Sequence, residues 1–299
     1  MKNFANKSIN DQLTVIGNSF YPCYLIQGSR KNLLIDSGVN VIAPVYTRLL
    51  DEALGNKNRL DYLFLTHSHY DHVGSSTYIK RLIPALKIGA HERIAPLLQK
   101  ESALTMMNNL SEAQRSRFIG ITGNEDVRIA PITVDITFRE GDAIDLGGLT
   151  CRVYEVPGHT RDSLAYYIPE IGALFSGEAA GVAEGKERRE PHVEFLASYD
   201  DYLASLEKMI SLNPQILCAA HGGVLMGDDA TDFLRRSYAA TPVYRRLIEQ
   251  YLAEAAGDIP RAIEMMVREE YDRKGVTAQE RNAYITNLTA QVKHIAGLR

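Results

Sequence analysis

Four side chains that can bind a metal ion lie within six residues of this sequence. They are His67, His69, Asp71 and His72. Histidine and aspartate seldom enter a protein core without a partner, so three imidazoles and one carboxylate this close together have few purely structural uses. The alternative interpretation is a polar loop of solvated histidines. Imidazole and carboxylate suit zinc, iron and manganese alike, so the residue types do not single out one metal.

The segment before this cluster predicts where the four side chains lie. Residues Tyr62–Thr66 are aromatic, aliphatic or β-branched, which is typical of a buried strand. The four candidates therefore follow the carboxyl end of a strand. Loops at strand ends carry many of the binding and catalytic residues of α/β proteins.

Composition excludes several classes of function. The 299 residues are 45% hydrophobic and 23% charged, which is ordinary for one large globular domain or two small ones. The 33 basic and 37 acidic residues give a formal net charge of −4. This weak acidity argues against a nucleic-acid partner and provides no polybasic patch for a membrane, so we expect a small-molecule substrate.

The cysteines and the N-terminal segment favour a reducing compartment. Cys23, Cys151 and Cys218 are odd in number and far apart, which predicts reduced, mostly buried thiols and not a disulfide framework. Residues 1–12 are polar and lack the apolar run of a signal peptide. No stretch approaches the roughly 18 to 20 apolar residues that a membrane-spanning helix needs. We therefore expect a cytoplasmic protein.

The first half of the chain alternates predicted strands and helices. One helix is predicted to begin at Pro44 and end at Gly55, and a second carries Tyr78 to Ile83. The predicted strands of this half are 13–16, 21–26, 32–35, 62–66 and 87–89.

Residues 91–120 break this alternation. Apolar residues recur there at helical spacing, which predicts two helices. These helices could form a lid over the ligand loop or could be a simple packing insertion, and the sequence leaves both interpretations open.

The second half begins with strands and ends with helices. After residue 197, a helix capped by Ser198 precedes a last buried strand, Ile216–Ala219. Ahead of the helix capped by Ser198, turns marked by glycine or proline separate predicted strands at 133–138, 143–146, 150–156, 163–168 and 173–176.

No strand is predicted beyond about Thr231. Helices are predicted to begin at Thr241–Pro242 and at Asp258–Pro260, and a third follows the capping-box spacing of Thr277 and Glu280. We therefore divide the chain into a domain at 1–228 and a C-terminal helical extension at 229–299. The extension is large enough to form one wall of a pocket or the contact of a homodimer.

Three further metal-binding side chains follow predicted strands. His159 lies in Pro157–Thr160, Glu178 follows Ser176-Gly177, and His221 begins the sequence His-Gly-Gly. Strand ends on one edge of a layered α/β fold converge, and sites form there. With the four residues of the first cluster, this gives seven candidate ligands, enough for two metal ions.

The order of these motifs resembles the metallo-β-lactamase superfamily over most of residues 13–228. The resemblance includes Leu34–Gly38, the His67–His72 cluster, Pro157–Thr160, Ser176–Glu178 and Ala220–Gly222. It implies an α/β (α+β) fold, the αββα sandwich, with the site at one edge of the two sheets. It also implies two divalent metal ions. The first would be bound by His67, His69 and His159, and the second by Asp71, His72 and His221.

Glu178 departs from the family pattern, which usually has a bridging aspartate at this place. Glutamate is longer by one methylene, so its carboxylate must fold back or the metals must shift, and metal sites tolerate only about 0.5 Å of misplacement. We expect Glu178 to bind metal, although a salt bridge to a neighbouring side chain is the alternative.

The resemblance implies hydrolysis by a metal-bridged hydroxide that attacks a carbonyl or phosphoryl centre. Asp71 would then shuttle a proton to the leaving group. Asp36 and Thr160 are candidates to orient the ligand histidines, and Asp36 could equally be a turn residue. Candidate substrate-pocket residues, for each of which packing or a solvated loop is the alternative, are Tyr70, Met106, Met107, His192 and Tyr284.

Three features narrow the substrate. The chain has no flavodoxin-like segment, which argues against an oxygen or nitric-oxide reductase, and no secretion signal, which argues against a periplasmic lactamase. Its helical C-terminus resembles that of glyoxalase II-type thioesterases. The motifs His69–Gly74, Glu101–Ala103 and His221–Gly223 resemble the quinolone-signal response thioesterases, which cleave aromatic acyl-CoA thioesters.

We therefore expect a thioesterase for acyl-CoA or glutathione thioesters. The alternatives are a lactone or phosphodiester hydrolase, or a regulatory interaction protein that retains a metal site. The best local cluster of basic residues for the phosphates of coenzyme A is Lys186, Arg188 and Arg189, for which a solvated face is the alternative.

Overall fold

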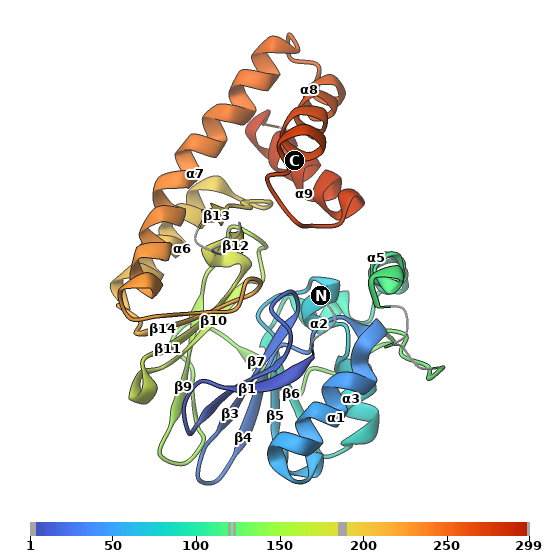
Figure 1. Ribbon diagram of the computed structural model, residues 1–299, viewed down its shortest axis with the longest axis vertical. Helices are drawn as coiled ribbons and strands as arrows, with labels where there is room; N and C mark the ends of the chain where they lie inside the picture. The colour runs from blue at the N-terminus through green and yellow to red at the C-terminus, as the bar shows by residue number, and fades with distance from the viewer. Residues whose placement is uncertain (1–3, 119–120, 122–123, 185–189, 298–299) are drawn as a thin grey trace. The chain divides into compact units, whose positions relative to one another are not determined.

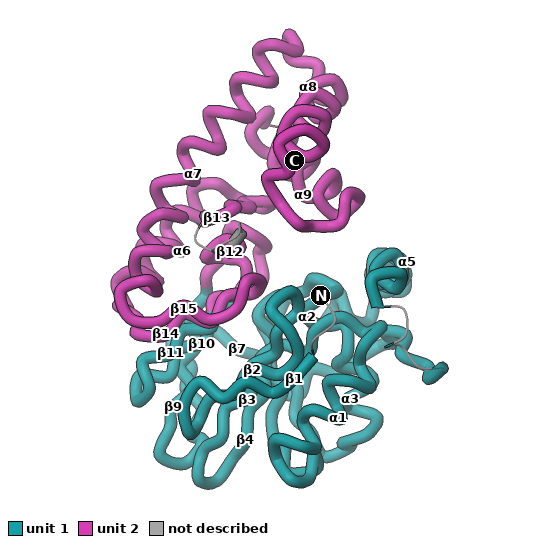
Figure 2. Tube along the Cα trace, viewed as in Figure 1, with its two compact units in different colours: residues 1–155, 164–175 teal, residues 156–163, 176–299 magenta. Residues whose placement is uncertain are grey.

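The computed structural model describes residues 4–118, 121, 124–184 and 190–297. The chain forms two compact units (Figure 2). Unit 1 contains Met1–Glu155 and Leu164–Phe175, and unit 2 contains Val156–Ser163 and Ser176–Arg299. The basic residues Lys186, Arg188 and Arg189 lie outside the described residues.

Unit 1 is built on a seven-stranded sheet whose strands follow the order of the chain. Neighbouring strands are antiparallel from β1 to β4 and parallel from β4 to β7. The change of direction follows from the connections, because parallel neighbours need a crossover that is usually helical. The strands are β1 (Ala5–Ser8), β2 (Leu13–Gly17), β3 (Pro22–Gln27), β4 (Asn32–Ile35), β5 (Tyr62–Phe64), β6 (Lys87–His91) and β7 (Ile136–Phe138).

The crossovers of this sheet carry helices with clear sequence signals. Helix α1 (Ala43–Leu54) has Pro44 in its first turn and ends at Gly55, whose φ of 69° is left-handed. Both boundaries were predicted and are confirmed. Helix α3 (Ser76–Leu82) lies beside α1 (Figure 1). The short helix α2 (Tyr70–Val73) contains two of the candidate ligands.

A second sheet packs against the first inside unit 1. It contains β8 (Ala143–Asp145), β9 (Thr150–Glu155), β10 (Leu164–Ile168) and the first residues of β11 (Ala173–Gly177), all antiparallel. Tyr166 of β10 packs on Phe64 of β5 with ring centroids 5.6 Å apart, and its hydroxyl donates to the carbonyl of Leu65 at 2.8 Å. The core therefore lies between two sheets, as in a sandwich.

The helical insertion contains the two predicted helices, α4 (Ile94–Leu97) and α5 (Glu101–Ala113). Helix α5 packs against α2. Just beyond α5, the Gln114 amide donates to the Tyr70 hydroxyl at 3.3 Å. The insertion therefore lies against α2, which carries two of the candidate ligands. Residues 119 and 120 of the predicted insertion, and the adjoining residues 122 and 123, lie outside the described residues.

Unit 2 consists of two hairpins and the C-terminal helices. Ser198 caps α6 (Tyr199–Ser211), as predicted, because its hydroxyl accepts from the amide of Asp201 at 3.2 Å. The hairpins are β12 (Val182–Glu184) with β13 (Glu190–His192), and β14 (Ile216–Ala219) with β15 (Val224–Met226); the helices that follow are α7 (Asp228–Glu254), α8 (Ile259–Met266), a π-helical turn at Val267–Lys274 and α9 (Arg281–Ile295).

Two predicted helix starts are wrong. Helix α7 runs through Pro242 without ending there. The hydroxyl of Thr241, just before the proline, donates to the carbonyl of Ser237 in the preceding turn at 2.7 Å. Helix α9 is capped by the carboxylate of Glu280, which accepts from two backbone amides, whereas the Thr277 hydroxyl accepts from Gln279 in the preceding turn. The predicted start at Asp258–Pro260 is confirmed.

The prediction for the three cysteines is confirmed. Cys23, Cys151 and Cys218 are buried and form no disulfide. Burial raises the pKa of each thiol above its usual value. Among the described residues, no helix has the length and apolar character to cross a membrane.

Candidate metal centre

Unit 1 gathers the four side chains of the first cluster. His67 and His72 are buried, and the ring of His67 lies 4.6 Å from that of His69 and 4.1 Å from that of His72, centroid to centroid. A ligand atom of His67 lies within 4.8 Å of one of His69, and the same holds for Asp71 and His72. The local turn geometry alone brings these groups together, because His67 and His69 precede α2 and the other two lie on it.

Asp36 fixes the orientation of one of these histidines. Its Oδ2 accepts from Nδ1 of His72 at 2.7 Å, and its two oxygens also accept from the amide and hydroxyl of Thr66 at 2.8 Å each. The backbone of Asp36 has a φ of 58°, a left-handed conformation that aspartate and asparagine tolerate better than most residues. The residue is both a turn residue and a partner of His72.

Thr66, which was not among the predicted site residues, links Asp36 to His67. The Thr66 hydroxyl has one proton, and only an acceptor such as the Asp36 carboxylate can take it. The same hydroxyl oxygen lies 3.1 Å from Nδ1 of His67. The parallel pairing of Ile35 with Phe64 brings the two strand ends together, so this contact follows from the sheet register.

Two glycines let the ligand loop pack closely. A Cβ atom at Gly74 would lie 2.3 Å from the carbonyl of Tyr70 and 2.8 Å from the amide of Asn40. A Cβ atom at Gly38, whose φ is +67°, would lie 2.3 Å from the ring of Tyr46. A larger residue at Gly74 would push α2 away from the segment that follows β4, and one at Gly38 would clash with Tyr46 of α1.

Unit 2 gathers the other candidate ligands around Glu178. Its Oε2 lies 2.7 Å from Nε2 of His159, and its Oε1 lies 3.2 Å from Nε2 of His221. His159 is fully buried, and only 4% of Glu178 is exposed. One carboxylate therefore contacts two histidines that lie 62 residues apart in the chain.

His159 has the same tautomer as His72. Its Nδ1 lies 2.8 Å from the backbone carbonyl of Glu194, which can only accept, so Nδ1 carries the proton. In both histidines Nδ1 donates to the protein, and the lone pair lies on Nε2. This arrangement is typical of histidines that bind a metal through Nε2.

Gly158 and α6 position the loop of His159. The carbonyl of Gly158 accepts from the amides of Ala197 and Ser198 at 3.0 and 3.1 Å. A Cβ atom at Gly158 would lie 2.4 Å from the amide nitrogen of Tyr202, and its φ is +131°. Glycine is required here both for the backbone conformation and for the close approach to α6.

The donor set fits a divalent metal. A neutral Nε2 and a carboxylate oxygen are both electron donors, and they repel at 2.7 Å unless a proton or a metal ion lies between them. Two ligands at zinc distances of about 2.0–2.1 Å in tetrahedral geometry are about 3.3 Å apart. The 3.2 Å between Glu178 and His221 matches this spacing, and the 2.7 Å to His159 needs a small relaxation.

A buried carboxylate next to His159 is ionised. Burial opposes ionisation of Glu194, yet the hydrogen bond from the adjacent His192 helps to bring the pKa of Glu194 below its usual value. Glu194 was not predicted as a site residue. Its amide donors, Gln279 and Asn287, lie 85 and 93 residues later in the chain, so no local pattern marked it.

The remaining predicted residues lie in two separate units. In unit 1, Tyr70 bonds Gln114, Met107 is buried and Met106 is 57% exposed. In unit 2, the Thr160 hydroxyl bonds that of Ser163 at 2.7 Å.

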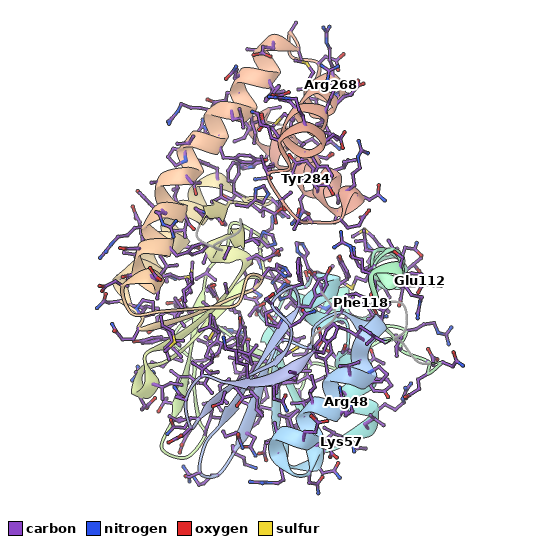
Figure 3. The ribbon with its side chains drawn as sticks, in the orientation of Figure 1. Arg48, Lys57, Glu112, Phe118, Arg268 and Tyr284 are labelled. Atoms are coloured by element: carbon purple, nitrogen blue, oxygen red, sulfur yellow. The ribbon has the colours of Figure 1, made fainter. Side chains whose placement is uncertain are left out.

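His192 and Tyr284 are buried in unit 2, so a solvated loop at His192 is wrong. Their ring centroids are 6.3 Å apart, and Figure 3 shows Tyr284 among the C-terminal helices. His192 also lines a groove of about 830 Å³ beside α7, together with Pro191, Arg236, Val243 and Tyr244.

Comparison with known proteins identifies the family that the sequence motifs resemble. Residues 16–221 match the model of the metallo-β-lactamase superfamily. A metallo-β-lactamase fold-containing protein of Sulfurisphaera tokodaii, ST1585, is 27% identical over 202 residues, which cover 68% of this chain and 72% of the relative. The human acyl-coenzyme A thioesterase MBLAC2 is 26% identical over 226 residues, which cover 70% of this chain and 76% of the relative.

A solved structure extends the similarity to the C-terminal helices. The metallo-β-lactamase family protein TTHA1429 of Thermus thermophilus aligns with a TM-score of 0.63 and 21% identity. The alignment covers 99% of this chain and 93% of that one. The predicted αββα fold is confirmed by these comparisons and by the two packed sheets.

Proposed function

Because the chain belongs to the metallo-β-lactamase superfamily of hydrolases, we propose that it is a dinuclear metal-dependent thioesterase. The substrate class is an acyl thioester of coenzyme A or glutathione. The chain would bind one metal through His67, His69 and His159 and the other through Asp71, His72 and His221, with Glu178 shared between them.

The contact between His159 and Glu178 carries this proposal. Since Nδ1 of His159 holds the proton, the 2.7 Å approach of Nε2 to the carboxylate calls for a cation. The second oxygen of Glu178 approaches His221, the histidine assigned to the other metal. A carboxylate that contacts one ligand from each set supports the two-metal arrangement.

The fixed histidines explain how the site would be prepared for chemistry. Asp36, Thr66 and the Glu194 carbonyl hold His72, His67 and His159 before any ligand arrives. Rigid ligands lose little entropy on binding a metal and keep its geometry constant during reaction. When bound, two divalent ions supply an acidified water and a positive charge beside the carbonyl oxygen of the substrate.

Asp71 would move the proton in thioester cleavage. In the proposal, one of its oxygens binds metal and the other accepts the proton that water loses on attack. The carbon–sulfur bond breaks, and Asp71 returns this proton to the departing thiolate, so that an acid and a thiol are released. No serine or cysteine nucleophile is needed, and the buried thiols described above are unsuited to that role.

The proposal of a thioester substrate rests on the similarity to known proteins. The name of the human relative states an acyl-coenzyme A thioesterase activity for that protein, over an alignment that covers 70% of this chain. The sequence motifs noted above point to the same class. Lactones and phosphodiesters remain the comparison substrates.

The test is a substrate panel on metal-analysed protein. Elemental analysis should find about two equivalents of zinc, iron or manganese per chain. Acyl-CoA and acyl-glutathione thioesters should be hydrolysed faster than a lactone or a phosphodiester, and a chelator should abolish the activity. Bound metal without turnover of any substrate would favour the interaction-protein alternative, and a folded protein that binds no metal would contradict the proposal.

A further inference from the structure

Glu194 connects the candidate ligand His159 to the C-terminal helix. We propose that Glu194 is a positioning residue that holds His159 in its metal-binding tautomer and that α9 holds Glu194 in place. The inference rests on the proposed function for its consequence, which is metal affinity, but its structural core can be tested without metal.

The backbone of Glu194 acts on His159 directly. Its carbonyl accepts from Nδ1 of His159 at 2.8 Å, and the histidine is fully buried. A carbonyl oxygen cannot donate, so this contact excludes the tautomer with the proton on Nε2. If the carbonyl moves, the tautomer and the ring orientation of His159 lose their restraint.

The side chain of Glu194 is held by two amides from the C-terminal segment. Nε2 of Gln279 donates to Oε1 at 2.9 Å, and Nδ2 of Asn287 donates to Oε1 and Oε2 at 3.1 and 3.2 Å. Only 1% of Glu194 is exposed, so water cannot replace these donors. A buried carboxylate that loses its donors is strongly destabilised, and the segment that carries it would move.

A third amide holds the neighbouring residue. Nε2 of Gln291 donates to the carbonyl of Val193 at 3.2 Å. Asn287 and Gln291 lie one turn apart on α9, so one face of this helix holds two successive residues, Val193 and Glu194. The helix therefore fixes the backbone beside His159 from two points.

A carboxylate is the group that these amides require. Gln279 and Asn287 both present N–H groups to Oε1, and Asn287 also reaches Oε2, so each carboxylate oxygen faces a donor. Glutamine at position 194 would turn one N–H₂ group towards another donor. The change Glu194→Gln therefore keeps the size of the side chain and removes its fit.

Thermodynamic linkage between metal binding and the packing of α9 has a second consequence. If α9 holds the tautomer that binds metal, metal binding must stabilise the packing of α9 by the same free energy. The C-terminal extension would then act on the metal centre through Glu194 without contributing a ligand.

The test compares Glu194→Gln and Asn287→Ala with the wild type. The control is Glu207→Gln, which changes an exposed glutamate of α6 whose partner is the Tyr238 hydroxyl. The ¹⁵N imidazole resonances of His159 in metal-free protein should show the Nδ1–H tautomer in the wild type and the control. Both test variants should show a mixture of tautomers, and their zinc affinity in a chelator competition should fall about 10- to 100-fold.

Each outcome decides the inference. Unchanged His159 resonances and zinc affinity in the folded test variants would overturn it and leave the proposed function intact. A wild type that binds no metal would overturn the proposed function, while the His159 resonances would still decide the role of Glu194. If Glu194→Gln does not fold, Asn287→Ala decides, because it leaves the carboxylate in place.

Discussion

Oδ2 of Asp36 lies 2.7 Å from Nδ1 of His72, and both side chains are buried at the ends of adjoining segments of unit 1. The contact selects the tautomer of His72 and explains why aspartate occupies a backbone position with a φ of 58°. A residue that only made the turn would not need its carboxylate aimed at an imidazole.

Asp36→Asn should weaken metal binding with little loss of fold. Asparagine tolerates the left-handed backbone, but it lacks the charge that orients His72. We expect zinc affinity to fall about 10- to 100-fold in a chelator competition, as for other partners of metal-binding histidines. Asp51→Asn, on the exposed side of α1, is the control and should bind zinc as the wild type does. Equal affinity in all three proteins would show that Asp36 is only a turn residue.

Glu178→Asp should impair the centre even though aspartate is the usual residue of the superfamily here. The glutamate reaches His159 at 2.7 Å and His221 at 3.2 Å, and a side chain shorter by one methylene cannot keep both contacts without a backbone shift. A misplacement of about 1 Å costs roughly 100-fold in rate. We expect a fall of about 10- to 100-fold in turnover or the loss of one metal equivalent.

The control for this change is Glu207→Asp, which shortens an exposed glutamate of α6. Elemental analysis and turnover are measured on the same samples. Unchanged metal content and unchanged turnover in Glu178→Asp would show that Glu178 does not bind metal.

Local signals in the sequence predicted most of the elements. Helix α1 was bounded by Pro44 and Gly55, and α6 by Ser198, because each signal acts within one turn of its helix. The signals misled where a tertiary or local contact outweighed them. Pro242 does not interrupt α7, and Glu280 rather than Thr277 caps α9.

The candidate ligands could be found from the sequence, but their supports could not. A ligand such as His67 stands in a recognisable motif, whereas Thr66 and Glu194 act through contacts with residues far away in the chain. Glu194 meets Asn287, 93 residues later, and no local pattern encodes that contact. Burial of His192 was missed for the same reason, since β13 becomes buried only when the C-terminal helices pack.

Gly158→Ala should destabilise the protein far more than Gly55→Ala. Both glycines have positive φ, but a Cβ atom at Gly158 would lie 2.4 Å from the backbone of Tyr202, whereas nothing lies within 4 Å at Gly55. The left-handed backbone alone costs about 1–2 kcal/mol, which is the loss expected for Gly55→Ala. The clash adds to this cost, so Gly158→Ala should lower the free energy of unfolding by about 3 kcal/mol or more. Urea unfolding measures both, and equal losses would show that α6 yields to the added methyl group.

Asp135 should make stability depend on pH. Burial opposes its ionisation, but the amide of Ile88 at 2.9 Å and the ammonium groups of Lys87 and Lys80 outweigh this, and its pKa lies below the usual value. The unfolded chain therefore takes up the proton first as pH falls. The contribution is fully present above the unfolded pKa of about 4 and is lost as pH falls through the folded pKa.

Asp135→Asn removes this contribution. We expect the free energy of unfolding of the variant to be about 1 kcal/mol lower than that of the wild type at pH 7, the value of a partly exposed charged hydrogen bond. The difference should become progressively smaller below pH 4. Urea unfolding of variant and wild type at pH 7 and pH 3 measures the difference. Asp232→Asn, which changes an exposed carboxylate of α7 that pairs with Arg235, should show little loss at either pH. A loss for Asp135→Asn that does not shrink in acid would mean that the side chain stabilises β6 and β7 by shape and not by charge.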